Sequence, residues 1–233
     1  LSITYNHEKY IIQHLESIKN QIGQYGKDIE FQLIISDDCS SDNTIPLVKK
    51  WLETNSNLFA HLDILESTIN QGTCKNYTKG IREIKGDFFK ALAGDDVFTN
   101  ESIFLAVELL NKYDIVCTPT GPFSENGLYN DKKIYSRVFE MYNYCSKDYD
   151  VIRRKYINIP MTPGVFMRKE LFTSEVIDFI NGYILIEDYS AAIKIYEENN
   201  ELKMGYYEKV FVLYRNHETA ITKTGNKRVR NLF

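Results

Sequence analysis

Three pairs of adjacent acidic residues could carry chemistry in this chain. They are Asp37 and Asp38 in "SDDCSSDNT", Asp95 and Asp96 in "KALAGDDVF", and Glu187 and Asp188 in "LIEDYS". Carboxylate oxygens suit Mg²⁺ and Mn²⁺, and an ionised carboxylate can also accept a proton from a hydroxyl group. Each pair also has a structural explanation, because acidic residues cap helices and favour their first turns. The place of each pair in the fold must decide between these readings.

The elements that would position these acids alternate between apolar strands and amphipathic helices. Strands are predicted at 1–4, 31–36, 61–67, 87–93 and 114–119, and helices at 8–22, 44–53, 73–84 and 100–113, the last with Asn100 as N-cap. This order predicts right-handed crossovers and a mainly parallel sheet, hence an α/β fold. Ligands of such sheets bind beyond the carboxyl ends of the strands, where the first two acid pairs fall.

The second half of the chain is less regular. Residues 120–158 are rich in Tyr, Asn, Lys and Asp, and we expect an inserted helical or loop subdomain there. A strand at 164–172 that passes into a helix, a helix at 187–200 and a strand at 210–215 follow. The third acid pair thus opens a helix, whose dipole favours negative charge at that end.

Composition excludes several classes of protein. The 233 residues are 43% hydrophobic, enough for a packed core, and the net charge of -4 argues against nucleic acid as the main partner. Four cysteines without zinc-site spacing are expected to be reduced thiols of a cytoplasmic protein. The longest apolar run, 103–110, is too short to span a bilayer. A basic tail, defined by Lys223, Lys227, Arg228 and Arg230, leaves peripheral contact with an anionic membrane open beside a solvated terminus.

No glycine-rich phosphate loop is present. Both GxGxxG and GxxxxGK[ST] are absent, and "TYNHEKY" stands after the first strand instead. If a nucleotide binds, its charge must therefore be neutralised in another way, usually by a divalent cation held on carboxylates.

Five stretches, in this order and spacing, resemble bacterial family 2 glycosyltransferases. They are "ITYNHEKYIIQHLESIKNQ", "SDDCSSDNT", "NQGTCKNYTKGI", "GDFFKALAGDDVF" and "IEDYSAAIKIY". The resemblance implies the GT-A fold, with a mainly parallel central sheet flanked by helices. It also implies a metal-dependent, inverting hexosyltransferase of polysaccharide or glycoprotein biosynthesis. The donor would be a nucleotide-diphosphate sugar, with UDP as the expected nucleotide, and the acceptor a glycan, glycolipid or glycoprotein.

The same resemblance assigns roles to residues. Those expected to bind the donor are Thr4, Tyr5, Asp37, Asp38, Asn70, Gly72, Lys75, Asn76, Asp95, Thr162, Gly164 and Arg215. The Mn²⁺ or Mg²⁺ ligands would be Asp96, Asp95 and His217, and the catalytic pair would be Asp188 as general base with Glu187 in support. Residues 1–233 would form one domain, with 1–119 as the nucleotide-binding half and 120–233 as the acceptor-binding and catalytic half.

Two departures from the family pattern keep alternatives open. Ala93 stands where a full DxD motif has an acid, and Tyr77 stands where many members have a diphosphate-binding Arg, so Lys75 or Lys79 would supply that charge. A non-catalytic or degenerate nucleotide-sugar-binding module is one alternative. A nucleotidyltransferase is another, although the glycine-rich activating loop of that class is missing. Homo-oligomerisation stays open. The histidines other than His217 are expected at helix surfaces or in strands.

Overall fold

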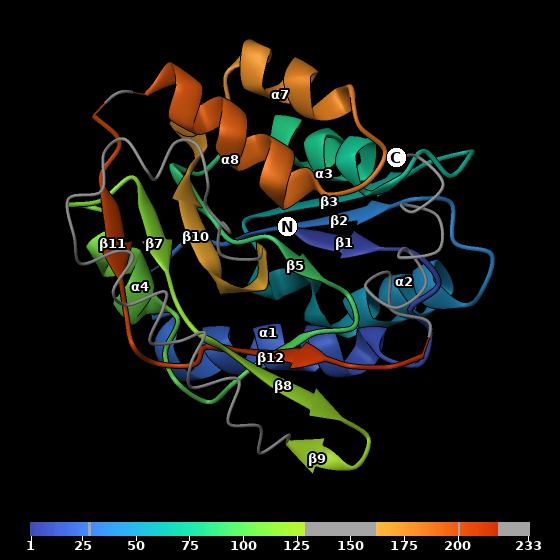
Figure 1. The fold of residues 1–233 in the computed structure, drawn as a ribbon. Coiled ribbons are helices and arrows are strands. Elements are labelled where there is room, and N and C mark those ends of the chain that lie inside the picture. Colours follow the sequence, from blue (N-terminus) through green and yellow to red (C-terminus); the bar gives the residue numbers. More distant parts are fainter. Residues whose placement is uncertain (28, 129–161, 200, 219–233) are drawn as a thin grey trace.

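A four-stranded parallel sheet lies at the centre of the molecule (Figure 1). The computed structural model describes residues 1–27, 29–128, 162–199 and 201–218. The central sheet has the order β3-β2-β1-β5, made of His61–Glu66, Gln32–Asp37, Ser2–Thr4 and Leu92–Ala93. Every neighbouring pair in it runs parallel, which confirms the predicted α/β class.

Helices cover both faces of this sheet, as Figure 1 shows. On one face lie α1 (Ile11–Tyr25) and α2 (Thr44–Asn55), and on the other α3 (Thr73–Arg82), α7 (Ser174–Asn181) and α8 (Glu187–Glu198). Ile11 and Leu15 of α1 share one helical face and are fully buried against β2. Burying one such side chain stabilises the fold by about 1.5–3 kcal/mol.

Two smaller sheets extend the core. One has the order β11-β7-β10-β4, made of Met204–Tyr206, Ile115–Cys117, Val165–Arg168 and Phe88–Phe89. The other has the order β6-β12-β8-β9, made of Val97–Phe98, Val212–Arg215, Thr120–Ser124 and Gly127–Leu128. Helix α4 (Phe104–Leu109) and the short 3-10 turns Ser56–Leu58, Thr162–Gly164 and Lys169–Leu171 complete the described elements. None of the helices in the described ranges is long and apolar enough to cross a membrane.

Two sequence predictions of single elements were wrong. The strand predicted at 87–93 is divided into β4 and β5, which belong to different sheets, since β4 pairs with β10 and β5 pairs with β1. Lys90, between them, donates to the carbonyl oxygen of Thr162 at 2.8 Å. The helix predicted at 100–113 is the shorter α4, and its N-cap is Ile103 rather than Asn100. Gln21 of α1 holds the preceding turn instead, because its amide donates to the carbonyl oxygens of Thr99 and Glu101.

The subdomain predicted at 120–158 is only partly described. Its first residues form strands β8 and β9 of a sheet with β12, where we expected helices or loops. Residues 129–158 lie outside the described part of the chain, as do the basic tail and Cys145. Strands β6 and β11 were not predicted, because two or three residues are too few to show a period.

Candidate active site

The carboxyl end of β1 lies between the first two acid pairs. Thr4 is paired with Asp37 of β2 on one side, and Ile3 with Ala93 of β5 on the other. The amide of Asp38 donates to the carbonyl oxygen of Thr4 at 3.0 Å, directly beyond the strand. The pairs therefore meet at one edge of the parallel sheet, as the sequence predicts.

Asp37 is buried and organises the loop after β2. Its Oδ1 accepts a hydrogen bond from the hydroxyl of Thr4 at 2.8 Å, and its Oδ2 accepts one from the amide of Ser40 at 2.8 Å. Cys39, which lies between Asp37 and Ser40 in the chain, has the left-handed φ of 65° that such a tight loop requires. The carboxylate thus fixes the shape of the loop around the end of β1.

Asp38 is also buried and binds the loop that precedes α3. Its two oxygens accept the amides of Gln71 and Gly72, each at 2.8 Å. Gly72 has a φ of +91°, and a Cβ there would lie only 2.4 Å from the carbonyl oxygen of Ile184. The same oxygen accepts the amide of Cys74 at 3.3 Å. Asp38 is therefore linked, through Gly72, to the segment that leads into α8.

Other residues that the resemblance assigns to the donor differ in where they point. Tyr5 and Asn70 are exposed at this edge of the sheet, with 43% of Tyr5 accessible. Asn76 lies inside, where its Nδ2 donates to the carbonyl oxygen of Ser36 at 2.9 Å and its Oδ1 accepts from the hydroxyl of Ser36. Asn76 thus joins α3 to β2 and does not reach the surface of the site.

Lys75, Tyr77 and Lys79 of α3 lie in three different environments. Tyr77 is buried in the core. Lys79 donates to the carbonyl oxygens of Asp37 and Leu65, at 2.9 and 3.0 Å, and so braces β2 and β3. Lys75 is exposed. Of the two lysines predicted to supply charge, Lys75 is the one whose ammonium group faces solvent.

Asp95 is largely buried at this edge, with two histidines around it. Its Oδ2 is 2.8 Å from Nε2 of His217 and 3.9 Å from Nε2 of His7. Burial opposes the charge on Asp95. The hydrogen bond from His217 and the fields of both imidazoles outweigh burial and lower the pKa of this carboxyl. The structure thus brings together Asp95 and His217, which are both among the predicted metal ligands.

Asp96 points inward. It is fully buried, its Oδ1 accepts the backbone amide of Arg215 at 2.8 Å, and its Oδ2 has no hydrogen-bond partner among the described residues. Burial, and then repulsion from Asp95, raise the pKa of Asp96 well above its usual value. The two acids of this pair, predicted as joint ligands, therefore occupy opposite environments.

His14 was missed from the sequence and lies behind the same turn. Its Nδ1 donates to the carbonyl oxygen of Asp96 at 2.8 Å, and its Nε2 accepts from the hydroxyl of Ser2 at 2.7 Å. His14 is fully buried, which contradicts the predicted surface position. Its spacing from Ile11 and Leu15 places it on the buried face of α1, and that signal could have revealed it.

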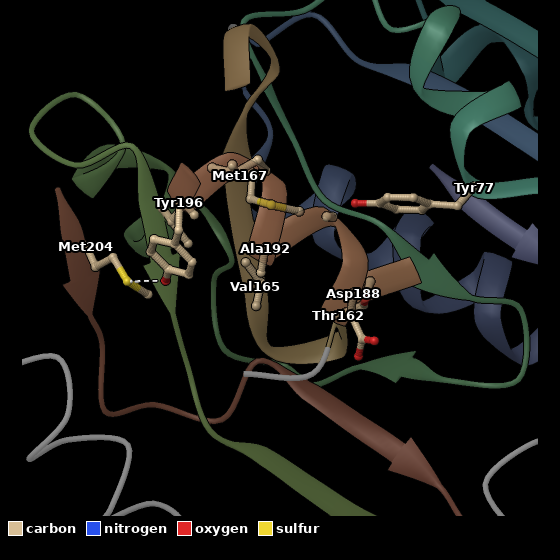
Figure 2. Close-up of a pocket in the computed structure, with 11 residues that line it drawn as sticks. Tyr77, Thr162, Val165, Met167, Asp188, Ala192, Tyr196 and Met204 are labelled. Atoms are coloured by element: carbon tan, nitrogen blue, oxygen red, sulfur yellow. Dashed lines mark hydrogen bonds between the residues drawn. The ribbon is translucent and has the colours of Figure 1, made fainter. Parts of the chain in front are cut away.

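Asp188 opens α8 beside a small apolar cavity. Ile186, which directly precedes α8, has a left-handed φ of 67°, an unusual conformation for a β-branched residue. The cavity, of about 30 Å³, lies between α8 and β10 (Figure 2). Asp188 and Thr162 lie at one end of it, and the hydroxyl of Tyr77 points into it. The predicted base thus lies next to Thr162, one of the residues predicted to bind the donor.

Glu187 has a different environment from Asp188. Burial, and then the negative charge of Asp188, raise the pKa of Glu187. The two adjacent acids therefore differ in environment, with Asp188 lining the cavity beside Thr162.

The Thr162–Gly164 turn is held from beneath. The carbonyl oxygen of Thr162 accepts from the ammonium group of Lys90 at 2.8 Å, and that of Gly164 accepts the amide of Thr118 at 2.7 Å. A Cβ on Gly164 would lie 2.4 Å from the carbonyl oxygen of Thr118. Burial lowers the pKa of Lys90 to about 7. Lys90 was not predicted, because it stands inside a continuous apolar run.

A family model decides the affiliation of the chain. The model described as "Glycosyl transferase family 2" matches residues 1–173. The chain belongs to this family.

The chain is also similar in sequence to proteins that are named as glycosyltransferases. It is 32% identical over 116 residues to "Uncharacterized glycosyltransferase MG060" of Mycoplasma genitalium, which covers 48% of the chain and 37% of that protein. It is 30% identical over 110 residues to "Poly(ribitol-phosphate) beta-N-acetylglucosaminyltransferase TarS" of Staphylococcus aureus, which covers 47% of the chain and 18% of that protein. The family 2 chain therefore spans well under half the length of either relative.

Solved structures confirm the fold of the family 2 chain. The TarS 1–349 complex with UDP superposes with a TM-score of 0.65 at 20% identity, covering 94% of this chain and 60% of that one. The mannosyltransferase PcManGT from Pyrobaculum calidifontis, in complex with GDP-Man and Mn²⁺, gives a TM-score of 0.68 at 20% identity, covering 99% and 60%. The GT-A fold expected from the sequence is confirmed.

Proposed function

We propose that the chain transfers a sugar, with inversion, from a nucleotide-diphosphate donor to a hydroxyl group of a glycan, glycolipid or glycoprotein. UDP is the favoured nucleotide. The observation that carries this proposal is the meeting of the first two acid pairs at the end of β1, with Asp38 linked through Gly72 to the segment before Asp188. The UDP complex of TarS and the GDP-Man complex of PcManGT agree with a nucleotide-sugar donor.

The donor would lie against the loops that Asp37 and Asp38 hold in shape. Both carboxylates already accept hydrogen bonds from the protein, so we assign them to loop geometry in addition to the predicted contact with the nucleotide-sugar donor. The exposed ring of Tyr5 can pack on a nucleobase, and the exposed ammonium group of Lys75 can meet the diphosphate.

A divalent cation fits the Asp95–His217 pair. One carboxylate oxygen and one imidazole nitrogen, 2.8 Å apart, are donors that Mn²⁺ accepts, and phosphate oxygens usually complete such sites. Across the described residues no cluster of three acidic, histidine or cysteine side chains is arranged to hold a metal by itself, so the diphosphate would share the ion. When bound, the cation would neutralise charge on the leaving diphosphate. Asp96, which points inward, would lie behind Asp95 and His217.

Asp188 would accept the proton of the acceptor hydroxyl as that group attacks the anomeric carbon. Its place next to Thr162 puts a carboxylate beside the Thr162–Gly164 turn, which would border the sugar of the donor. Glu187, whose pKa is raised by burial and by Asp188, would support Asp188 from the adjacent position. The three described free cysteines agree with activity in the cytoplasm, and peripheral membrane contact stays a prediction.

A non-catalytic nucleotide-sugar-binding module is the second candidate. Ala93 favours it, because β5 places a methyl group beside Ile3 where a full DxD motif has an acid. Such a module would bind the donor without releasing its nucleotide.

The test is Asp188→Asn, with release of UDP measured over a panel of UDP-sugars and donor binding measured separately. The expected result is a loss of turnover of about 10²–10⁴-fold with little change in donor affinity. Asp178→Asn is the matched control, since Asp178 is an exposed acid on the neighbouring helix α7. Turnover of Asp188→Asn near the parent rate would refute the base. A parent protein that binds UDP-sugars but releases no UDP would favour the binding module.

A further inference from the structure

Arg215 ends strand β12, two residues before His217, and only 5% of it is exposed. We propose that Arg215 is a positioning residue. It would fasten the Asp95–Asp96 turn to β12 and so set the place of His217 relative to Asp95, rather than bind a phosphate group. The inference rests on the proposed function, in which Asp95 and His217 share the cation.

Arg215 makes three hydrogen bonds, two to the turn and one to helix α1. Its Nε donates to the carbonyl oxygen of Asp95 at 2.6 Å, and its backbone amide donates to Oδ1 of Asp96 at 2.8 Å. Its Nη2 donates to Oε1 of Gln13 on α1 at 2.5 Å. One residue thus holds the backbone of the first acid, the side chain of the second acid and the helix behind them.

Two aromatic rings enclose the guanidinium group. Its Cζ lies 4.6 Å from the ring centroid of Tyr10 and 4.3 Å from that of Phe123. Cation–π contacts of this kind are stronger when they are shielded from water. The ring of Tyr10 also packs on the imidazole of His217, with centroids 4.9 Å apart. A guanidinium group enclosed in this way presents little surface to a diphosphate.

The position of Arg215 also fixes the strand that leads to His217. Arg215 is paired with Phe123 of β8, and Leu213 is paired with Val97 of β6, directly after the acid pair. A shift of Arg215 would therefore carry His217 away from Asp95. Lysine cannot replace Arg215 here, because its single nitrogen cannot reach the Asp95 carbonyl and Gln13 together in the planar arrangement of a guanidinium group.

The experiment compares Arg215→Lys with the parent in calorimetric titrations of UDP, once with Mn²⁺ and once with a chelator. Arg168→Lys is a matched control, because Nε of Arg168 also donates to a backbone carbonyl, that of Leu110 at 3.0 Å, and its Cζ lies 5.3 Å from the ring centroid of Phe88. We expect Arg215→Lys to lose about tenfold or more of the affinity gained from Mn²⁺, with metal-free affinity unchanged. The control should keep both affinities.

Two results of this comparison would overturn the inference. An equal loss of UDP affinity with and without Mn²⁺ would mean that Arg215 contacts the phosphates, and no loss in either condition would mean that it positions nothing. If Arg215→Lys does not fold, Gln13→Ala removes one guanidinium partner and should reduce the Mn²⁺ gain in the same direction; an unchanged gain contradicts the inference.

A metal-independent readout separates this inference from the proposed function. Ring ¹⁵N resonances of His217, assigned with His217→Asn, should move in Arg215→Lys and stay in place in Arg168→Lys. Unmoved resonances would overturn the positioning role, whether or not Mn²⁺ affects UDP binding. The absence of any Mn²⁺ effect on UDP binding in the parent protein would instead count against the proposed cation site alone.

Discussion

Replacing Gly72 by alanine should displace the segment that leads to the proposed base. The φ of +91° at Gly72 lies outside the regions that L-residues favour, so alanine there costs about 1–2 kcal/mol in backbone strain alone. The new Cβ would lie 2.4 Å from the carbonyl oxygen of Ile184, so that carbonyl must retreat by about 1 Å to reach ordinary contact. A misplacement of about 1 Å can lower an enzymatic rate about 100-fold.

The assay is kcat for UDP release at saturating donor, with the folded fraction checked by circular dichroism. Gly127→Ala is the matched control, because Gly127 has a φ of +100° but nothing within 4 Å of the added Cβ. Gly72→Ala should lose about 100-fold in kcat, and Gly127→Ala should stay near the parent. If the kcat values of the two folded variants agree within about twofold, the coupling between Gly72 and Asp188 is wrong.

Two buried titrating groups each make stability rise with pH, in different pH windows. Burial lowers the pKa of His14 to about 4, so its contribution to stability is complete above pH 6.5 and is lost as the pH falls toward 4. Between pH 7.5 and 5 this loss is about 2 kcal/mol, and His14→Gln should remove it from urea unfolding curves; an equal pH dependence in parent and variant contradicts the burial argument. Burial lowers the pKa of Lys90 from 10.5 to about 7, so the unfolded chain binds the extra proton and stability rises with pH across that window. Between pH 7 and 9 the parent should gain about 2 kcal/mol that Lys90→Met lacks, and a variant that gains as much would refute the assignment.

Most elements of the nucleotide-binding half could be predicted from the sequence. The strands and helices up to residue 84 agree with the structure within a few residues, because their apolar periods are strong and their boundaries carry polar turns. The break between β4 and β5 could not be predicted, because it depends on which distant strand each half pairs with, β10 for β4 and β1 for β5. Gln21 likewise shapes the start of α4 from a distant helix.

The edge at which the site forms was predictable, but the direction of each side chain was not. Parallel strands end at a common edge, so Asp37 and Asp95 had to lie near the end of β1. Whether Asp95 or Asp96 faces outward depends on the turn after β5, and that turn is held by His14 and Arg215. These contacts join residues more than 80 positions apart, and no local pattern encodes them.

The central claim is that the end of β1 binds a nucleotide diphosphate together with a cation on Asp95 and His217. Calorimetric titration of UDP into the parent and into Asp95→Asn, with Mn²⁺ and with a chelator, tests it most directly. The account predicts that Mn²⁺ raises the UDP affinity of the parent by about tenfold or more and leaves that of Asp95→Asn unchanged. Equal UDP affinity with and without Mn²⁺ in the parent, or an undiminished Mn²⁺ effect in Asp95→Asn, would contradict it.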